Sequence, residues 1–472
     1  MLQMARSAVE AARLFLDFVN ETGSPYHAVA QSVKLLRAHG FQELPDGSSW
    51  PLAKGGKYFV TKGGADVMAF VVGGNFSAKG ESGFSMVGAH TDSPCLRLRP
   101  NSKMSSAGML QVGIQPYGGG LWHTWFDRPL GMAGKVVIRD STSGSLSEQL
   151  VRIAKPVMLL PNLAIHLHSA DERKAFQVNP ETHLQPILCS KMFEKEASKQ
   201  EDDEAKDEST RHHMALLRML AKELGCQPSD ILDADLCLMD AMPSSFCGLY
   251  DEFISSPRID NLLSTWAAVQ GICEFATESD KVAQAQDVLV AVSFDHEEAG
   301  SQSATGAEGE TFPAWLERIL GGLDVPPLTR PQVYARSFLV SADCAHGLHP
   351  NYAAKHQAEH RPELHKGIVI KSNANQRYAT TPLTAALLRE VCRRADVPVQ
   401  DFVVRNDSPC GTTIGPIISA KTGVRTIDVG AAQWAMHSCR ESCATSDAAH
   451  LLELCKAFYT NFRRIDSATS KL

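Results

Sequence analysis

Apolar residues recur along the chain at two spacings, one typical of helices and one typical of buried strands. Residues 7–20 place apolar positions three and four residues apart, which predicts an amphipathic surface helix. Runs that are almost wholly apolar, such as 67–72, 85–89 and 288–294, predict strands covered on both faces. After residue 247 such runs alternate with helical segments. This alternation predicts an α/β fold with a mixed central sheet flanked by helices.

The middle of the chain has a different residue composition and a different hydrophobic pattern. Residues 98–246 contain glycine, tryptophan and short strand-like pieces, mostly without a helix-length period. We therefore expect one discontinuous domain, residues 1–97 and 247–472, interrupted by an inserted β-rich domain at 98–246. Residues 194–210 of the insertion are highly charged and nearly lack large apolar side chains, which predicts a flexible acidic loop.

Composition narrows the class of protein. The chain has 472 residues and a net charge of −7, from 46 basic and 53 acidic residues. This balance argues against a nucleic-acid or anionic-membrane partner. The 12 cysteines are scattered without a C-x-x-C pair, which is typical of reduced thiols in a cytosolic protein. No apolar run is long enough to span a membrane. We expect a soluble cytoplasmic protein.

Five short phrases place side chains that bind metals at the end of a predicted strand or the start of a helix. They are GAHTDSP (His90, Asp92), SPRIDN (Asp260), FDHEEAGS (Glu297, Glu298), SADCAH (Asp343, His346) and AMHS (His437). Taken singly, most of these residues fit an ordinary polar loop or a helix cap. The adjacent Glu297 and Glu298 are harder to explain without a cation, because they follow a buried strand and repel each other. In an open α/β sheet, the strand ends gather such residues at one edge.

Histidines and carboxylates in this number suit a pair of zinc ions with mixed nitrogen and oxygen ligands and an open position for water. Two-metal hydrolytic sites need a bridging carboxylate. Of two neighbouring glutamates, one can bind metal while the other accepts a proton from water. A carboxylate two residues after a histidine can orient that histidine. The pattern therefore predicts metal-assisted hydrolysis.

These five phrases, in this order, resemble the M18 family of metallopeptidases, the aspartyl aminopeptidases. The resemblance covers essentially the whole chain and includes the phrases TWFDR, YDEFISSPRIDNL, HPNY, QRYAT and RNDSPCGTTIGP. It implies a zinc-aminopeptidase-like catalytic domain that removes unblocked N-terminal aspartate or glutamate from peptides. A broader two-metal aminopeptidase, an amidohydrolase or deacylase, and a particle-forming protein with secondary catalysis remain alternatives.

The resemblance also implies a role for each ligand residue. One zinc would be held by His90 and Asp343, the other by Glu298 and His437, with Asp260 bridging, Glu297 as general base and Asp92 orienting His90. Manganese or cobalt could replace zinc at sites of this kind.

Substrate and assembly are the remaining expectations. An acidic first residue needs cationic or donor groups, and the candidates are Lys371, Arg377, His346 and the backbone at Gly411 and Thr412. The neutral Asn375 leaves the preference between aspartate and other residues open. The resemblance further implies a large homo-oligomer, a tetrahedral dodecamer assembled through the insertion. In such an assembly His166 would reach into a neighbouring subunit's site.

Overall fold

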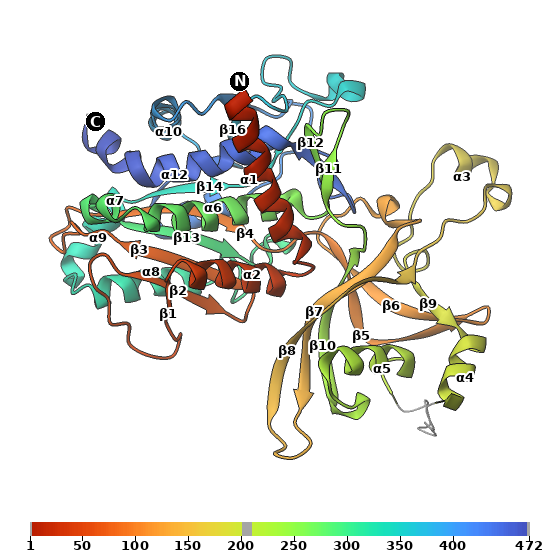
Figure 1. Ribbon diagram of the computed structural model, residues 1–472. Coiled ribbons are helices and arrows are strands. Elements are labelled where there is room, and N and C mark those ends of the chain that lie inside the picture. The colour runs from red at the N-terminus through yellow and green to blue at the C-terminus, as the bar shows by residue number, and fades with distance from the viewer. Residues whose placement is uncertain (1, 201–209, 470–472) are drawn as a thin grey trace.

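The protein consists of a helix-covered sheet and a β-barrel that projects from one end of it (Figure 1). The structure is a computed structural model that describes residues 2–200 and 210–469. Among the described residues, no helix is both long and apolar enough to cross a membrane. The α/β class with a β-rich insertion, predicted from the sequence, is confirmed.

The main sheet is mixed, and its four central strands are parallel to one another. Nine strands of the described residues form it, in the order β1 (Gln42–Glu43), β2 (Lys57–Lys62), β3 (Asp66–Val72), β13 (Val288–Phe294), β4 (Phe84–His90), β14 (Phe338–Ala342), β18 (Arg425–Gly430), β16 (Ile368–Lys371) and β17 (Val399–Phe402). The parallel strands are β13, β4, β14 and β18. Every residue of β4, β13 and β14 is buried, as their continuous apolar runs predict.

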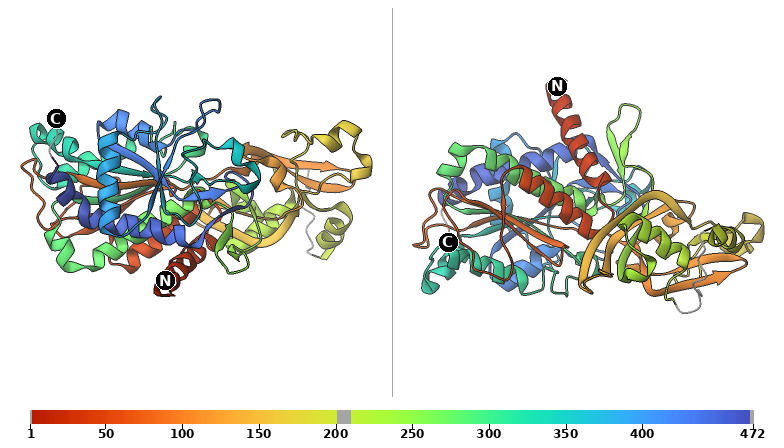
Figure 2. Two further views of the ribbon diagram at one scale, coloured as in Figure 1. Left: turned by 90° about the horizontal axis from the view of Figure 1, so that it is seen from above. Right: turned by 60° about the horizontal axis from the view of Figure 1, so that its bottom comes forward.

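Helices cover both faces of this sheet (Figure 2). One face carries α1 (Leu2–Asn20), α2 (Pro25–Ala38), α6 (Ile259–Thr277), α10 (Pro382–Arg394) and α12 (Thr445–Ser467). The other carries α8 (Thr311–Gly322), α9 (Arg330–Arg336) and α11 (Ile414–Thr422). Trp266 and Phe458 fill the first core, and Trp315 fills the second. Two packed faces hold the strand ends at one edge in a fixed position. The short helix α7 (Ser279–Gln284) connects α6 to β13.

The barrel closes on itself, so the described residues leave it no open sheet edge. Its strands follow the order β10 (Ile231–Asp240), β5 (Cys95–Ser106), β6 (Met109–Tyr117), β9 (Ile187–Ser190), β8 (Leu146–Leu159) and β7 (Pro129–Arg139). Helix α5 (Met214–Leu224) packs against it, while α3 (Ala170–Lys174) lies on a projecting arm (Figure 1). The domain boundaries near residues 97 and 247 stay a prediction.

A small third sheet borders the edge where the central strands end. Its strands follow the order β11 (Ser245–Cys247), β12 (Phe253–Ser256), β20 (Glu441–Ala444), β19 (Ala432–Trp434) and β15 (Ala345–His346). It links the chain that leaves the barrel to the C-terminal part of the main domain, because β12 pairs with β20.

The prediction of an acidic loop at 194–210 is wrong for its first part. Helix α4 (Lys191–Gln200) runs through residues 194–200. Lysine, glutamate, alanine and glutamine all favour helices, so high charge alone did not exclude one. Glu194 also forms an ion pair with Arg218 of α5, which holds the helix against the barrel. Residues 201–209 lie outside the described residues.

Candidate metal centre

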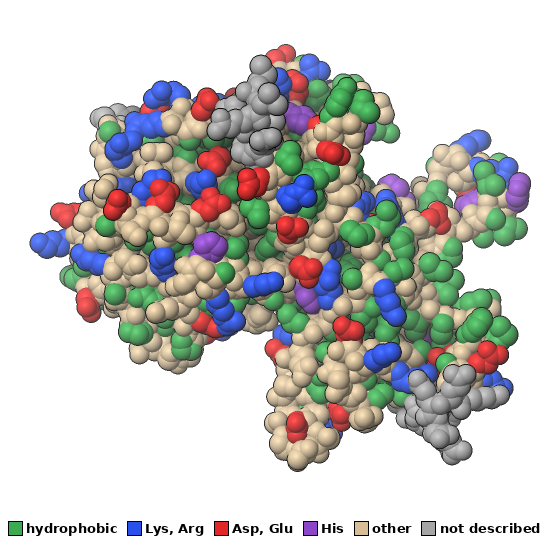
Figure 3. All heavy atoms as spheres, viewed as in Figure 1, with side chains coloured by type: hydrophobic (Ala, Val, Ile, Leu, Met, Phe, Trp, Pro, Cys, Tyr) green, Lys and Arg blue, Asp and Glu red, His purple; other side chains and the backbone are tan. Residues whose placement is uncertain are grey.

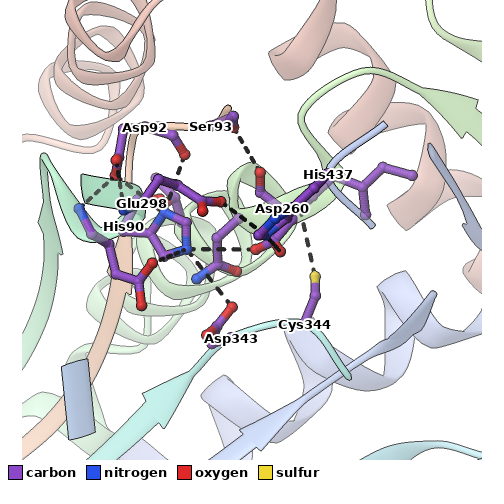
Figure 4. A network of polar contacts seen from close by, with 12 residues as sticks. His90, Asp92, Ser93, Asp260, Glu298, Asp343, Cys344 and His437 are labelled. Carbon is purple, nitrogen blue, oxygen red and sulfur yellow. Dashed lines mark hydrogen bonds and ion pairs between the residues drawn. The ribbon is translucent and has the colours of Figure 1, made fainter. Parts of the chain in front are cut away.

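The four parallel strands bring the predicted metal ligands to one edge of the sheet. His90 is the last residue of β4, and Phe294, its partner in register at the end of β13, is followed closely by Glu297 and Glu298. Asp343 follows β14 directly. Asp260 lies at the start of α6, and His437 follows β19. Figure 4 shows the side chains of five of them converging on one space: His90, Asp260, Glu298, Asp343 and His437.

The Nε2 atom of His90 faces three carboxylates. It lies 3.5 Å from Asp260 Oδ1, 3.7 Å from Asp343 Oδ1 and 3.8 Å from Glu297 Oε2. The His90 side chain is 2% exposed, so these contacts form out of reach of bulk water.

The second histidine faces the other oxygen of the same aspartate. His437 Nε2 lies 3.5 Å from Asp260 Oδ2 and 3.3 Å from Glu298 Oε1. The two oxygens of Asp260 therefore point to different histidines, which is the arrangement that a bridging carboxylate needs.

These spacings fit metal ions. Ligand atoms that each lie 2.0–2.2 Å from a tetrahedral zinc ion are roughly 3.3–3.6 Å apart. Two groups of three described residues have ligand atoms within 4.8 Å of one another: His90, Glu297 and Asp343, and His90, Asp260 and Glu298. His437 falls outside both groups but reaches the second through Glu298 and Asp260. Within the described chain, the buried atoms Asp260 Oδ1 and Glu298 Oε1 lack a hydrogen-bond partner. Such orphaned acceptors fit a cation.

The electrostatics of the site also favour a cation. Burial raises the pKa of Glu297 to about 8, and Asp343 and Asp92 act in the same direction against His90. Burial likewise raises the pKa of Glu298 well above its usual range, with Asp260 adding to it. Burial opposes ionisation of Asp260 too, but the neighbouring rings of His437 and His90 lower its pKa. Positive charge is what stabilises this set of carboxylates.

Comparison with known proteins agrees with this geometry. A family model described as "Aminopeptidase I zinc metalloprotease (M18)" matches residues 18–459. The chain belongs to the M18 family. An aspartyl aminopeptidase from Caenorhabditis elegans is 44% identical to this M18 chain over 460 residues, which cover 95% of each protein.

Solved structures of M18 relatives share the fold. A chain in the Ape4 and Nbr1 complex matches with a TM-score of 0.93 and 41% identity, over 98% of this chain and 88% of that one. The S. cerevisiae mApe1 dodecamer matches with a TM-score of 0.85 and 27% identity, over 98% and 99%. The predictions of family and enzyme class are confirmed, and this M18 protein is a metallo-aminopeptidase.

Glu441 of the M18 enzyme is a site residue that the sequence motifs did not single out. Its Oε2 accepts the backbone N–H of Asp260 at 3.0 Å, and its Oε1 accepts that of His437 at 2.8 Å. One buried carboxylate therefore fixes the backbone of two predicted ligands. The available signal was an acidic residue four positions after His437, which alone is weak.

The side chain of Lys371 is almost fully buried, whereas a lysine can bind substrate with its ammonium group exposed. Its side chain is 3% exposed, and its Nζ is 3.6 Å from Asp343 Oδ2. The same ammonium donates to the carbonyl of Cys344 at 3.1 Å. Lys371 therefore holds the Asp343 carboxylate in place, whatever else it contacts.

The other candidate substrate-binding residues lie in two parts of the structure, the main domain and the segment between β8 and α3. Arg377 donates through Nε to the carbonyls of Cys410 and Gly411, at 3.1 and 3.2 Å, and its own carbonyl accepts the hydroxyl of Thr412. The ring of His346 lies close to Phe402, 5.6 Å between centroids. These residues all belong to the main domain, whereas His166 is exposed in a short turn, Ile165–Leu167, between β8 and α3.

Replacing Glu441 by glutamine should weaken metal binding. An amide offers one acceptor where the structure uses two, so either Asp260 or His437 loses its backbone contact. We expect zinc affinity and kcat to fall by about 10-fold or more. The measurement is zinc per subunit after dialysis at fixed free zinc, with the exposed Glu10→Gln as control. Full zinc occupancy together with wild-type kcat would contradict this role.

Proposed function

We propose that this enzyme removes an unblocked N-terminal aspartate or glutamate from peptides by two-zinc hydrolysis. The carrying observation is that Asp260 presents one oxygen to each of two histidines, His90 and His437. That arrangement supports a pair of metal sites sharing one carboxylate. The C. elegans relative, named aspartyl aminopeptidase, supports the acidic substrate.

These contacts support the ligand roles that the family resemblance implies. His90 and Asp343 would hold one zinc, Glu298 and His437 the other, with Asp260 shared. When bound, the ions would polarise the scissile carbonyl and lower the pKa of water. Asp92 would orient His90, since the Nδ1 of that ring lies 3.2 Å from Asp92 Oδ1.

Glu297 would move the protons. Its carboxylate borders the site, 12% exposed, with Oε2 3.8 Å from His90 Nε2. Its backbone N–H donates to Asp92 at 3.2 Å, which fixes the start of the side chain. Glu297 would accept a proton from the attacking water and deliver it to the leaving amine.

Among the candidate residues, Arg377 has the donors to bind the acidic side chain of the substrate. Its Nε is engaged by two carbonyls, while its terminal nitrogens make no hydrogen bond or ion pair with the described chain. A guanidinium held in this way can bind a carboxylate with two donors. The backbone at Gly411 and Thr412, together with His346, would complete the pocket. Lys371 would contribute positive charge from beneath Asp343, and the exposed amide of Asn375 adds no charge.

The proposed assembly is a large homo-oligomer, a tetrahedral dodecamer, formed through the barrel. A relative is a dodecamer. The arm around α3 exposes five large apolar side chains that a partner subunit could cover: Leu159, Leu163, Ile165, Leu167 and Phe176. Figure 3 shows hydrophobic and histidine side chains on this arm. His166 lies between two of these residues and would enter the neighbouring subunit's site.

A peptide panel that differs only at the first residue tests substrate and metal together. We expect release of N-terminal aspartate and glutamate, loss of activity with a chelator, and recovery with zinc or manganese. Acetylation of the N-terminus should abolish cleavage. Metal-dependent release of neutral residues would instead indicate a broader pocket, and cleavage of blocked substrates a deacylase. No cleavage at all with two metals bound would favour a particle-forming role.

Glu297→Gln tests the division of roles between the adjacent glutamates. The amide keeps the shape of the side chain but cannot accept a proton, so we expect kcat to fall by roughly 10²–10⁴-fold. Both zinc ions should stay bound, as measured by elemental analysis of the purified enzyme. The exposed Glu310→Gln serves as control. Loss of one zinc in the Glu297 variant would show that this residue is a ligand.

A further inference from the structure

We propose that residues 117–119, at the end of barrel strand β6 and just beyond it, orient both histidines of the metal centre, so that the barrel completes that centre. This inference rests on the proposed roles of His90 and His437 as zinc ligands. It gives the YGGG segment at 117–120, which none of the ligand roles uses, a function of its own.

The first contact runs through Asp92. The hydroxyl of Tyr117 donates to Asp92 Oδ2 at 2.6 Å, and the backbone N–H of Glu298 donates to the same oxygen at 3.0 Å. With Oδ2 occupied, Oδ1 lies 3.2 Å from His90 Nδ1, which is also 3.1 Å from the backbone carbonyl oxygen of Asp92. Asp92 is fully buried, so water does not replace a lost donor easily. Tyr117 thus orients the Asp92 carboxylate, and this carboxylate helps to orient the His90 ring.

Tyr117 is itself held by neighbours from both domains. The guanidinium carbon of Arg97, on β5, lies 3.8 Å from the centre of the Tyr117 ring, a close cation–π contact. Arg97 reaches Asp235 of β10 at 3.4 Å, and the hydroxyl of Tyr26, on α2, donates to the same carboxylate oxygen at 2.6 Å. The hydroxyl of Tyr117 therefore has little freedom to move away from Asp92.

The second contact reaches His437 directly. The carbonyl of Gly119 lies 2.8 Å from His437 Nδ1 and accepts its proton. The next residues hold the backbone around the same histidine: Leu121 N–H donates to the His437 carbonyl at 2.9 Å, and Cys439 N–H donates to Thr124 Oγ1 at 2.8 Å. Because Gly119 fixes Nδ1, Nε2 is left facing Glu298 and Asp260.

Gly118 explains why this segment contains glycine. Its φ is +72°, a left-handed backbone that glycine adopts without steric cost. A Cβ there would lie 3.1 Å from Glu298 Cβ and 3.3 Å from the Glu298 carbonyl oxygen. The barrel backbone therefore approaches the Glu297–Glu298 turn closely enough for its neighbours on either side to reach Asp92 and His437.

The two histidines share one design. Each ring is held at Nδ1, in His90 by the backbone carbonyl and carboxylate of Asp92 and in His437 by the carbonyl of Gly119, and presents Nε2 to the carboxylates. Partners of this kind fix the tautomer and the orientation of a metal-binding histidine. Here both partners depend on three consecutive residues of the barrel. We therefore class Tyr117 and Gly119 as positioning residues.

Tyr117→Phe removes one hydroxyl and tests the first contact. We expect zinc affinity, measured by competition with a chromophoric chelator, to fall by about 10-fold, because Asp92 loses a buried donor. The kcat should fall by a similar factor, with KM within about twofold of wild type and oligomer size unchanged. Tyr250→Phe is the matched control, because Tyr250 is 82% exposed. A purely structural role would lower thermal stability without changing zinc affinity.

Gly118→Ala tests the close approach, with Gly108→Ala as its control. Both glycines have a left-handed φ, +72° and +79°, but a Cβ at Gly108 meets nothing within 4 Å. The strain of the backbone is therefore common to both variants. We expect Gly118→Ala to lose zinc affinity and kcat by about 10-fold or more, and Gly108→Ala to keep both.

The outcomes separate this inference from the proposed function. Wild-type zinc affinity in both Tyr117→Phe and Gly118→Ala would overturn the role of the barrel, while the two-zinc mechanism would stand. If the wild-type enzyme binds no zinc, the proposed function fails and this inference fails with it. Reduced zinc affinity in Tyr250→Phe or Gly108→Ala to the same degree would also overturn it.

Discussion

Four acidic side chains share a nearly dry space at one edge of the sheet, and their mutual repulsion is the constraint on which the site depends. Asp260, Glu298, Glu297 and Asp343 are 4, 5, 12 and 13% exposed. Where the dielectric is low, like charges at such distances are costly unless cations lie between them. The fold must therefore both hold the carboxylates together and supply positive charge. Rigid, fully buried strands hold the carboxylates together, and metal ions would supply most of the positive charge.

Donor groups of the protein form hydrogen bonds or ion pairs with carboxylate oxygens that face away from the metal positions. Lys371 lies against the outer oxygen of Asp343, while backbone N–H groups and Tyr117 occupy Asp92. Glu441 acts as an acceptor instead of a donor. Its carboxylate accepts the backbone N–H groups of two candidate ligand residues, Asp260 and His437. Each candidate ligand is thus held by the protein at one point, the backbone N–H in Asp260 and Glu298 and a side-chain atom in the others, and presents another atom inward. These fixed points explain why residues from several elements can form one ordered centre.

How much of this was predictable depends on whether a contact leaves a local pattern. The strands at 85–89 and 288–294, and the meeting of the candidate ligand residues at their ends, were predicted, because continuous apolar runs indicate strands buried on both faces. The contacts of Glu441 with Asp260 and of Tyr117 with Asp92 were not, since they join residues 181 and 25 positions apart in the chain through a backbone group and a hydroxyl. The helix at the start of the predicted acidic loop was missed for a different reason. Its lysines and glutamates favour a helix as readily as they favour solvent.

The path of the chain brings the barrel to the metal centre. The barrel begins at β5, five residues after His90, and the chain returns from β10 through β12 to Asp260 at the start of α6. Entry and exit of the insertion therefore each border a predicted ligand. The contacts of Tyr117 and Gly119 add a third attachment between them. Three attachments around one centre fix a rigid body, so a shift of the barrel would reach both histidines. Any subunit contact that holds the barrel would then also hold the ligands.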